Sequence, residues 1–94
     1  MEAEVRREPE NSRYALVRDG ETIGFADYEV QGNVILFTHT EVDPEYQGQG
    51  LAAQLVHEAL EDVRTTTDLR LIPLCSYVSA WLGRHPEYQD LRSR

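Results

Sequence analysis

The residues best suited to chemistry form the segment Gln47-Gly48-Gln49-Gly50-Leu51-Ala52, which lies between an extended segment and an amphipathic helix. The first backbone N–H groups of a helix have no intrahelical partner, and they attract anions. Two glycines also let the main chain approach a ligand without an intervening Cβ. The segment therefore predicts a site for a pyrophosphate group. A Rossmann loop or a Walker loop would need a different pattern, so neither is present.

Three other side chains could move protons or form a covalent bond. His39 and Glu41 are two residues apart in an extended segment, so we expect them on one face with their side chains starting roughly 6 to 7 Å apart. Cys75 is expected at the start of a helix, whose field lowers the pKa of a thiol. The alternatives are a solvated glutamate, a semi-buried histidine and a small buried cysteine.

Metal chemistry has little support in the sequence. Histidine occurs only at positions 39, 57 and 85, and Cys75 is the one cysteine. No partner lies at a metal-ligand spacing from His57, so we expect no metal site.

The elements that must position these residues are predicted as follows. Asp19-Gly20 predicts a tight hairpin turn between the strands Tyr14 to Arg18 and Thr22 to Val30, and a third strand covers Val34 to Val42. Strict alternation in the third strand would place Val34, Leu36, Thr38, Thr40 and Val42 on one face and Ile35, Phe37, His39 and Glu41 on the other.

Helical periodicity begins after Gly50, with Leu51, Leu55 and Ala59 among its apolar positions, and Thr65 to Thr67 are expected to form the exit loop. A parallel strand follows at Leu69 to Leu74. Ser76 is then expected to cap a second helix that Pro86 ends. The predicted fold class is α+β, with a mixed sheet of a three-stranded antiparallel meander, a crossover helix, a parallel strand and a C-terminal helix.

Length and charge limit the function classes. The 94 residues predict a single domain, 1–94, with flexible ends at residues 1–11 and after Leu91. A net charge of −8 argues against nucleic acid and anionic membranes as partners. No apolar run reaches the length of a membrane span or a signal peptide, and a lone cysteine fits a reducing compartment, so we expect a cytoplasmic protein.

The glycine-containing segment resembles the pyrophosphate loop of the Gcn5-related N-acetyltransferase (GNAT) superfamily, Gln/Arg-x-x-Gly-x-Gly/Ala, through Gln47, Gly50 and Ala52. Further motifs, namely Thr38-His39-Thr40-Glu41-Val42, Pro73-x-Cys75 and His85-Pro86-Glu87-Tyr88, are similar to a minimal branch of short predicted acetyltransferases. The resemblance covers about Tyr14 to Leu91, and it implies a truncated GNAT-like fold that binds acetyl-CoA.

The resemblance also implies how coenzyme A would be held. In that superfamily two parallel strands splay apart and the pantetheine arm inserts between them, which here implies a splay between Thr38 to Val42 and Leu69 to Pro73. A backbone contact would come from Val42, and the pyrophosphate would bind the amides of Gln47, Gly48, Gln49, Gly50, Leu51 and Ala52. Cys75 and Tyr77 would lie near the thiol.

Catalytic roles follow from the same resemblance. Glu41 is the expected base for an amine acceptor, a small molecule or a protein, and His39 is a second candidate. Cys75 could accept the acyl group from the thioester. Tyr77 could protonate the leaving thiolate, although tyrosines at such positions are more often part of the core. Tyr88 is expected to dock the chain end.

One departure from the superfamily concerns the acceptor side. Two further strands usually follow the second helix, so the acceptor wall here is expected to be open or completed in a homodimer. The alternatives to an N-acetyltransferase are a non-catalytic acyl-CoA-binding module, an acyl carrier that uses Cys75, and a small interaction domain that binds no CoA.

Overall fold

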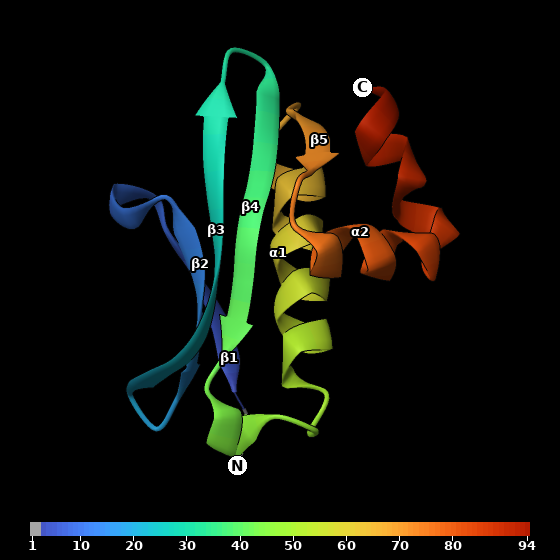
Figure 1. Cartoon of the computed structure of the whole chain (residues 1–94). Helices are drawn as coiled ribbons and strands as arrows, with labels where there is room; N and C mark the ends of the chain where they lie inside the picture. The colour runs from blue at the N-terminus through green and yellow to red at the C-terminus, as the bar shows by residue number, and fades with distance from the viewer. Residues whose placement is uncertain (1–2) are drawn as a thin grey trace.

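A five-stranded sheet forms one layer of the protein in this computed structural model, which describes residues 3–94. The strands lie in chain order, β1-β2-β3-β4-β5 (Figure 1). The first four strands pair antiparallel, and β5 pairs parallel to β4. Their bounds are β1 Glu4–Glu8, β2 Arg13–Arg18, β3 Glu21–Gln31, β4 Val34–Val42 and β5 Arg70–Pro73. The predicted α+β class with a mixed sheet is confirmed.

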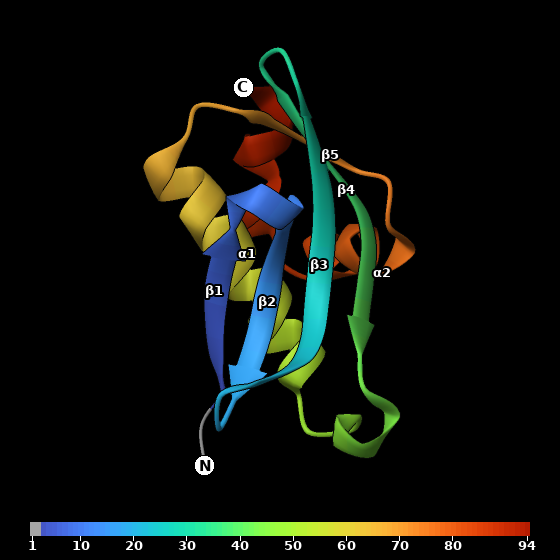
Figure 2. The same ribbon diagram turned by 90° about the vertical axis from the view of Figure 1, so that its left-hand side faces the viewer.

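The helices form a second layer on one face of the sheet. They are α1 Leu51–Thr66 and α2 Ser76–Gly83, with short 3-10 segments η1 Pro9–Asn11, η2 Pro44–Tyr46 and η3 Pro86–Ser93. Figure 2 is turned by 90° from Figure 1, and in it the strands lie in front and α1 and α2 behind them. Within residues 3–94, no helix has the length and apolar character needed to cross a membrane.

The apolar stripe of α1 makes the core. Its buried residues are Leu51, Leu55, Val56, Ala59, Leu60 and Val63, and they pack in one cluster with Ile35 and Phe37 of β4 and Trp81 of α2. Burying each large side chain contributes about 1.5–3 kcal/mol, so this stripe holds the helix on the sheet. The beginning of α1 is thereby fixed relative to β4.

The N-terminal segment differs from the expectation. Residues 1–11 were expected to be flexible, but Glu4–Glu8 form β1, which pairs with β2 along its whole length. Four of its five residues are charged, and the pattern is that of a solvated edge strand in which Val5 packs against the core. Residues 1–2 lie outside the described part of the chain.

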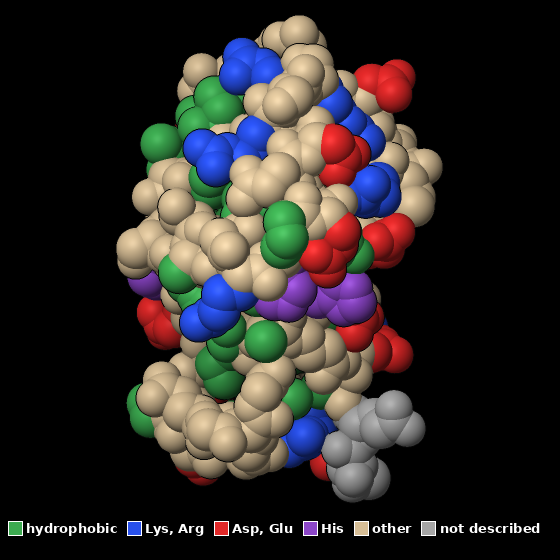
Figure 3. Space-filling view, turned by 90° about the vertical axis from the view of Figure 1, so that its right-hand side faces the viewer, with side chains coloured by type: hydrophobic (Ala, Val, Ile, Leu, Met, Phe, Trp, Pro, Cys, Tyr) green, Lys and Arg blue, Asp and Glu red, His purple; other side chains and the backbone are tan. Residues whose placement is uncertain are grey.

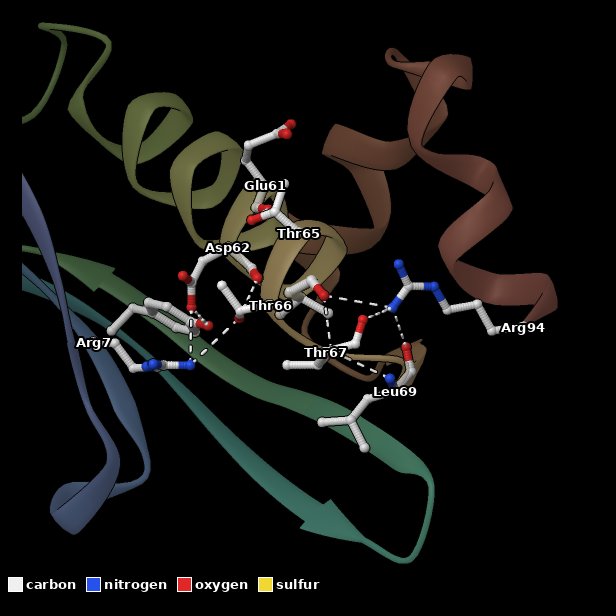
Figure 4. A network of polar contacts seen from close by, with 10 residues as sticks. Arg7, Glu61, Asp62, Thr65, Thr66, Thr67, Leu69 and Arg94 are labelled. Carbon is white, nitrogen blue, oxygen red and sulfur yellow. Dashed lines mark hydrogen bonds and ion pairs between the residues drawn. The ribbon is translucent and has the colours of Figure 1, made fainter.

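The end of α1 also differs from the expectation. Thr65 and Thr66 belong to the helix, and their hydroxyls donate to the carbonyls of Glu61 and Asp62 one turn earlier at 2.9 and 2.6 Å. Arg94, expected to be flexible, donates to the carbonyls of Thr67 and Leu69 at 2.8 and 3.1 Å (Figure 4). It also donates to the Arg64 carbonyl at 3.0 Å. The chain end thus satisfies carbonyls that the helix terminus leaves open.

The start of α2 corrects another expectation. Ser76 is the first helical residue and not the cap, since the N-cap position is taken by Cys75. The helix ends before Pro86, as predicted, and η3 begins there.

Candidate active site

The two parallel strands stay together over only part of β4. The pairing runs from Val34 with Arg70 to Phe37 with Pro73, and the Cys75 N–H then donates to the Phe37 carbonyl at 2.8 Å. Beyond this point the chain turns into α2 (Figure 1). The edge of β4 from Thr38 to Val42 therefore has no strand partner. The predicted splay was wrong in one respect, because β5 remains paired and the start of α2 forms the other side of the gap.

A β-bulge changes the faces of β4. The ladder with β3 pairs Asp27 with His39 and Tyr28 with Phe37, so Thr38 is the extra residue. The prediction that side chains alternate strictly between the two faces along the whole of β4 was therefore wrong. Ile35, Phe37 and Val42 are all buried in the core, whereas the side chains of His39 and Glu41 are 57% and 56% exposed.

The bulge also decides which backbone groups face the gap. The Asp43 N–H donates to Ile23 of β3 at 2.8 Å, and N–H groups of successive strand residues point to opposite edges. The N–H groups of Val42 and Thr40 are thereby directed away from β3, toward the gap. The Val42 carbonyl on the same side accepts a hydrogen bond from the Gln47 side chain at 3.1 Å.

The end of β4 lies unusually close to β3. A Cβ added to Gly24 would lie 2.8 Å from the backbone oxygen of Glu41, which is too close for any other residue at this position without movement of the backbone. Gly24 therefore lets the two strands approach where Glu41 is held.

The segment after β4 presents free backbone donors. Gly48 and Gly50 have φ angles of 83° and 76°, in the left-handed region where other residues are strained. No side chain caps α1, and its first turn contains no acidic residue. The first N–H groups of α1 are consequently available to an anion, as the sequence predicted.

These features border one cavity, which we call the slot. It has a volume of about 540 Å³. The predicted residues that line it are His39, Glu41, Val42, Gln47, Gly48, Gly50, Leu51, Ala52 and Tyr77, and the sequence analysis missed Thr40, Tyr46 and Ala53. The proximity of Tyr46 and Ala53 to the glycine segment could have indicated them. Gln49 and Cys75 do not line the slot.

His39 and Glu41 lie together, as predicted. The His39 Nε2 and the Glu41 Oε1 are 3.1 Å apart, and the Phe25 ring lies 5.9 Å from the imidazole. Both side chains extend from the face of the sheet that carries no helix, while the slot also opens to the amides of α1. The pair can thus reach a group that enters from the opposite side to an anion bound at α1.

Cys75 does not line the slot itself, but it contacts Thr40, which does. Its thiol donates to the Thr40 hydroxyl at 3.5 Å. Burial raises the pKa of the thiol, but hydrogen bonds from Thr40 and from the amides of Val78 and Tyr77 outweigh burial, and the net pKa is lowered. The predicted direction of this pKa shift is confirmed.

The remaining candidates have structural contacts. Gln49 accepts a 3.4 Å hydrogen bond from Arg18, whose guanidinium also lies over the Tyr46 ring. Tyr88 docks the chain end, as predicted, by donating to Glu61 at 2.7 Å. In the part of the chain that the structure describes, no cluster of three potential ligands could hold a metal ion.

Several solved structures are similar to this chain, among them the following two. The GNAT family N-acetyltransferase YhbS from Escherichia coli, in complex with CoA, is 29% identical over 65% of this chain and 38% of that chain, with a TM-score of 0.56. N-acetylglutamate synthase from Neisseria gonorrhoeae, complexed with CoA and N-acetyl-glutamate, is 18% identical over 97% of this chain and 26% of that chain. Its TM-score of 0.62 shows a shared fold. The chain thus spans well under half of either protein.

A comparison with curated protein sequences found no match. A protein-family model described as GCN5-related N-acetyl-transferase matches residues 13–91, which include both strands beside the slot, the glycine segment and Cys75. The chain belongs to the GCN5-related N-acetyltransferase family.

Proposed function

We propose that this chain binds acetyl-CoA in the slot and transfers the acetyl group to an amine. One observation carries the proposal: a single cavity joins the uncapped start of α1 to the His39–Glu41 pair. The two solved relatives were both crystallised with CoA, which supports the same donor here. Bound acetyl-CoA would supply an activated thioester.

The residues of the slot fit such a donor. The amides from Gln47 to Ala52 would hold the pyrophosphate, because α1 carries no side-chain cap that competes for them. The N–H groups of Val42 and Thr40 are directed toward the gap, where an amide-containing arm can pair with a strand edge. Apolar atoms of Leu51 and Ala52 cover the adjoining wall.

Proton transfer is assigned to the exposed pair. Glu41 would take a proton from the attacking amine, directly or through water, and His39 would hold its carboxylate through the 3.1 Å contact. As the new N–C bond forms, the C–S bond breaks and the sulfur takes a proton. The Tyr77 hydroxyl is the candidate donor for that proton, since Tyr77 lines the slot from α2.

The test is release of free CoA from acetyl-CoA in the presence of a panel of primary amines, from small diamines to lysine peptides. The proposal expects turnover with at least one amine. A protein that binds CoA but releases none with any acceptor would instead be a non-catalytic acyl-CoA-binding module.

The acyl carrier is a second candidate, favoured by the lowered pKa of Cys75 and its contact with Thr40. The chain contains no lysine, so few groups besides Cys75 and the N-terminus can be acetylated. Intact-mass measurement after exposure to acetyl-CoA tests this role. An added acetyl group that hydroxylamine removes and Cys75→Ala abolishes would support the carrier, whereas an unmodified protein would exclude it.

A further inference from the structure

The glycine segment receives little support from its own backbone. Within residues 3–94, neither Gly48 nor Gln49 makes a backbone hydrogen bond. Their amides are thereby available to an anion, but the main chain that carries them has no internal bracing. Ordering a glycine-containing chain costs more conformational entropy than ordering other residues. The amides therefore depend on contacts from outside the segment to stay in one arrangement.

Basic side chains are scarce at this end of the helical side. The glycine segment lies at the lower end of the molecule in Figure 1, between β4 and α1. Figure 3 shows the side that faces right in Figure 1, and most of its Lys and Arg side chains lie in the upper half. An anion at the glycine segment would thus be held mainly by backbone amides, and such a set of donors is effective only when it converges on one point.

Two side chains anchor the glycine segment to the sheet. Gln47 donates to the Val42 carbonyl at the end of β4 at 3.1 Å. Arg18, the last residue of β2, donates to the Gln49 side chain at 3.4 Å, and its guanidinium carbon lies 5.6 Å from the centre of the Tyr46 ring. One guanidinium therefore contacts the segment and the turn that precedes it.

The contacts of Arg18 use properties that lysine lacks. A planar guanidinium can lie over an aromatic ring and still donate N–H groups in its own plane, whereas an ammonium group is a strongly hydrated point charge. Both ends of the contact are well supported, because Arg18 lies opposite Glu21 in the β2–β3 ladder and Tyr46 packs against the core. Arg18 thus connects the end of the sheet to the glycine segment.

We propose that Arg18 is a positioning residue for the acyl donor, an inference that rests on the proposed function. Through Tyr46 and Gln49 it would hold the glycine segment in the arrangement in which the amides converge on the pyrophosphate. The guanidinium would act through these two residues and would not touch the donor. Loss of Arg18 should therefore weaken ligands that carry a pyrophosphate and spare ligands that lack one.

Calorimetry with CoA and steady-state kinetics with acetyl-CoA test the inference. Arg18→Met removes both contacts, so it should weaken CoA binding roughly tenfold and raise KM for acetyl-CoA by a similar factor. The kcat and the KM for the amine should stay unchanged, because the acceptor side is untouched. Arg18→Lys keeps the charge without the planar fork and should be about as weak as Arg18→Met. Wild-type affinity for CoA in either variant would overturn the inference.

Pantetheine is the second probe, because it lacks the pyrophosphate. As an inhibitor that competes with acetyl-CoA, it should have the same Ki for the wild type and for Arg18→Met. A Ki that rises as much as the KM for acetyl-CoA would mean that the whole slot has been disturbed, and the inference would be wrong.

Arg13→Met is the matched control. Arg13 begins the same strand, donates to Glu8 at 2.8 Å and lies 5.7 Å from the centre of the Phe25 ring, so it makes the same two kinds of contact away from the glycine segment. It should leave the affinity for CoA unchanged. An equal loss in Arg13→Met and Arg18→Met would contradict the inference while the proposed function stands. A wild-type protein that neither binds CoA nor releases it from acetyl-CoA would overturn the proposed function itself.

Discussion

At the scale of single residues, the proposed chemistry depends on Glu41 more than on any other side chain. Its carboxylate contacts His39 and stands at the mouth of the slot, at a position that Gly24 allows by its close approach. The sequence showed that the two residues share a face. It did not show that this face is the open one, because the bulge at Thr38 depends on the pairing with β3 and has no local signal.

Glu41→Gln should lower kcat about 100- to 1,000-fold, because the amide cannot accept the proton of the amine. Affinity for CoA should stay within twofold of the wild type, because the proposal assigns the carboxylate to the acceptor amine and Gln keeps the size of the side chain. Steady-state kinetics and calorimetry measure the two effects separately. An unchanged kcat in Glu41→Gln would remove Glu41 from the mechanism.

Tyr88 permits a pH prediction. Its hydrogen bond to Glu61, together with burial, raises the pKa of Tyr88 from 10.0 to about 12. The folded state therefore holds this proton more tightly than the unfolded state. That contribution to stability is complete below pH 10 and is lost as the pH rises toward 12.

Tyr88→Phe should be less stable at pH 8 by about 1 kcal/mol, and the difference from the wild type should shrink between pH 10 and 12. Urea unfolding across that range measures it. Tyr46→Phe serves as the control, since the Tyr46 hydroxyl has no hydrogen bond within residues 3–94. A difference that stays constant with pH would contradict the assigned pKa.

At the scale of elements, the start of α1 was the most predictable part of the site. The glycines, the change to helical period and the absence of a capping side chain are all readable from the sequence. The gap beside the edge of β4 from Thr38 to Val42 was harder to predict. Its position depends on where the pairing of β5 with β4 stops, and the sequence carries no signal for that point. Similarly, β1 was not predicted, because four of its five residues are charged and Val5 alone gives no alternating apolar pattern.

Gly50→Ala tests the glycine segment. A Cβ at this position meets nothing within 4 Å, so the cost is the strain of a φ of 76°, about 1–2 kcal/mol. Relaxing that strain rotates the amides at the start of α1, and we expect at least a tenfold loss of CoA affinity by calorimetry.

The matched control is Gly32→Ala, which has a φ of 60° and equally free space, in the β3–β4 turn at the opposite end of the sheet. It should lose similar stability and keep its CoA affinity. If both variants bind CoA like the wild type, the amides at Gly50 do not hold the ligand.

Arg94 provides a test of the helical layer at the other end of α1. Arg94→Ala removes the donors to Arg64, Thr67 and Leu69 and should cost about 1–3 kcal/mol in the free energy of unfolding. Arg92→Ala, which loses only a 3.3 Å contact to Gln89, should change stability little. Chemical denaturation compares them, and equal stabilities would show that the chain end does not support α1.

At the scale of the whole molecule, charge is the main obstacle to the proposed donor. A protein with a net charge of −8 must bind a polyanion, so the attraction has to be local. In the proposed function the uncapped amides of α1 would supply it, on the helical face. The His39–Glu41 pair lines the same slot but extends from the face of the sheet without helices, so the proposed acceptor and the anionic part of the donor would approach from different sides.

The most direct test of the central claim, that the slot binds CoA, is the melting temperature with and without CoA. At 100 times its Kd, a ligand that binds only the folded state adds about 2.7 kcal/mol, which for a domain of this size raises Tm on the order of 10 °C. The account predicts that rise for the wild type and a smaller one for Gly50→Ala at the same CoA concentration. An unchanged Tm at millimolar CoA would contradict it.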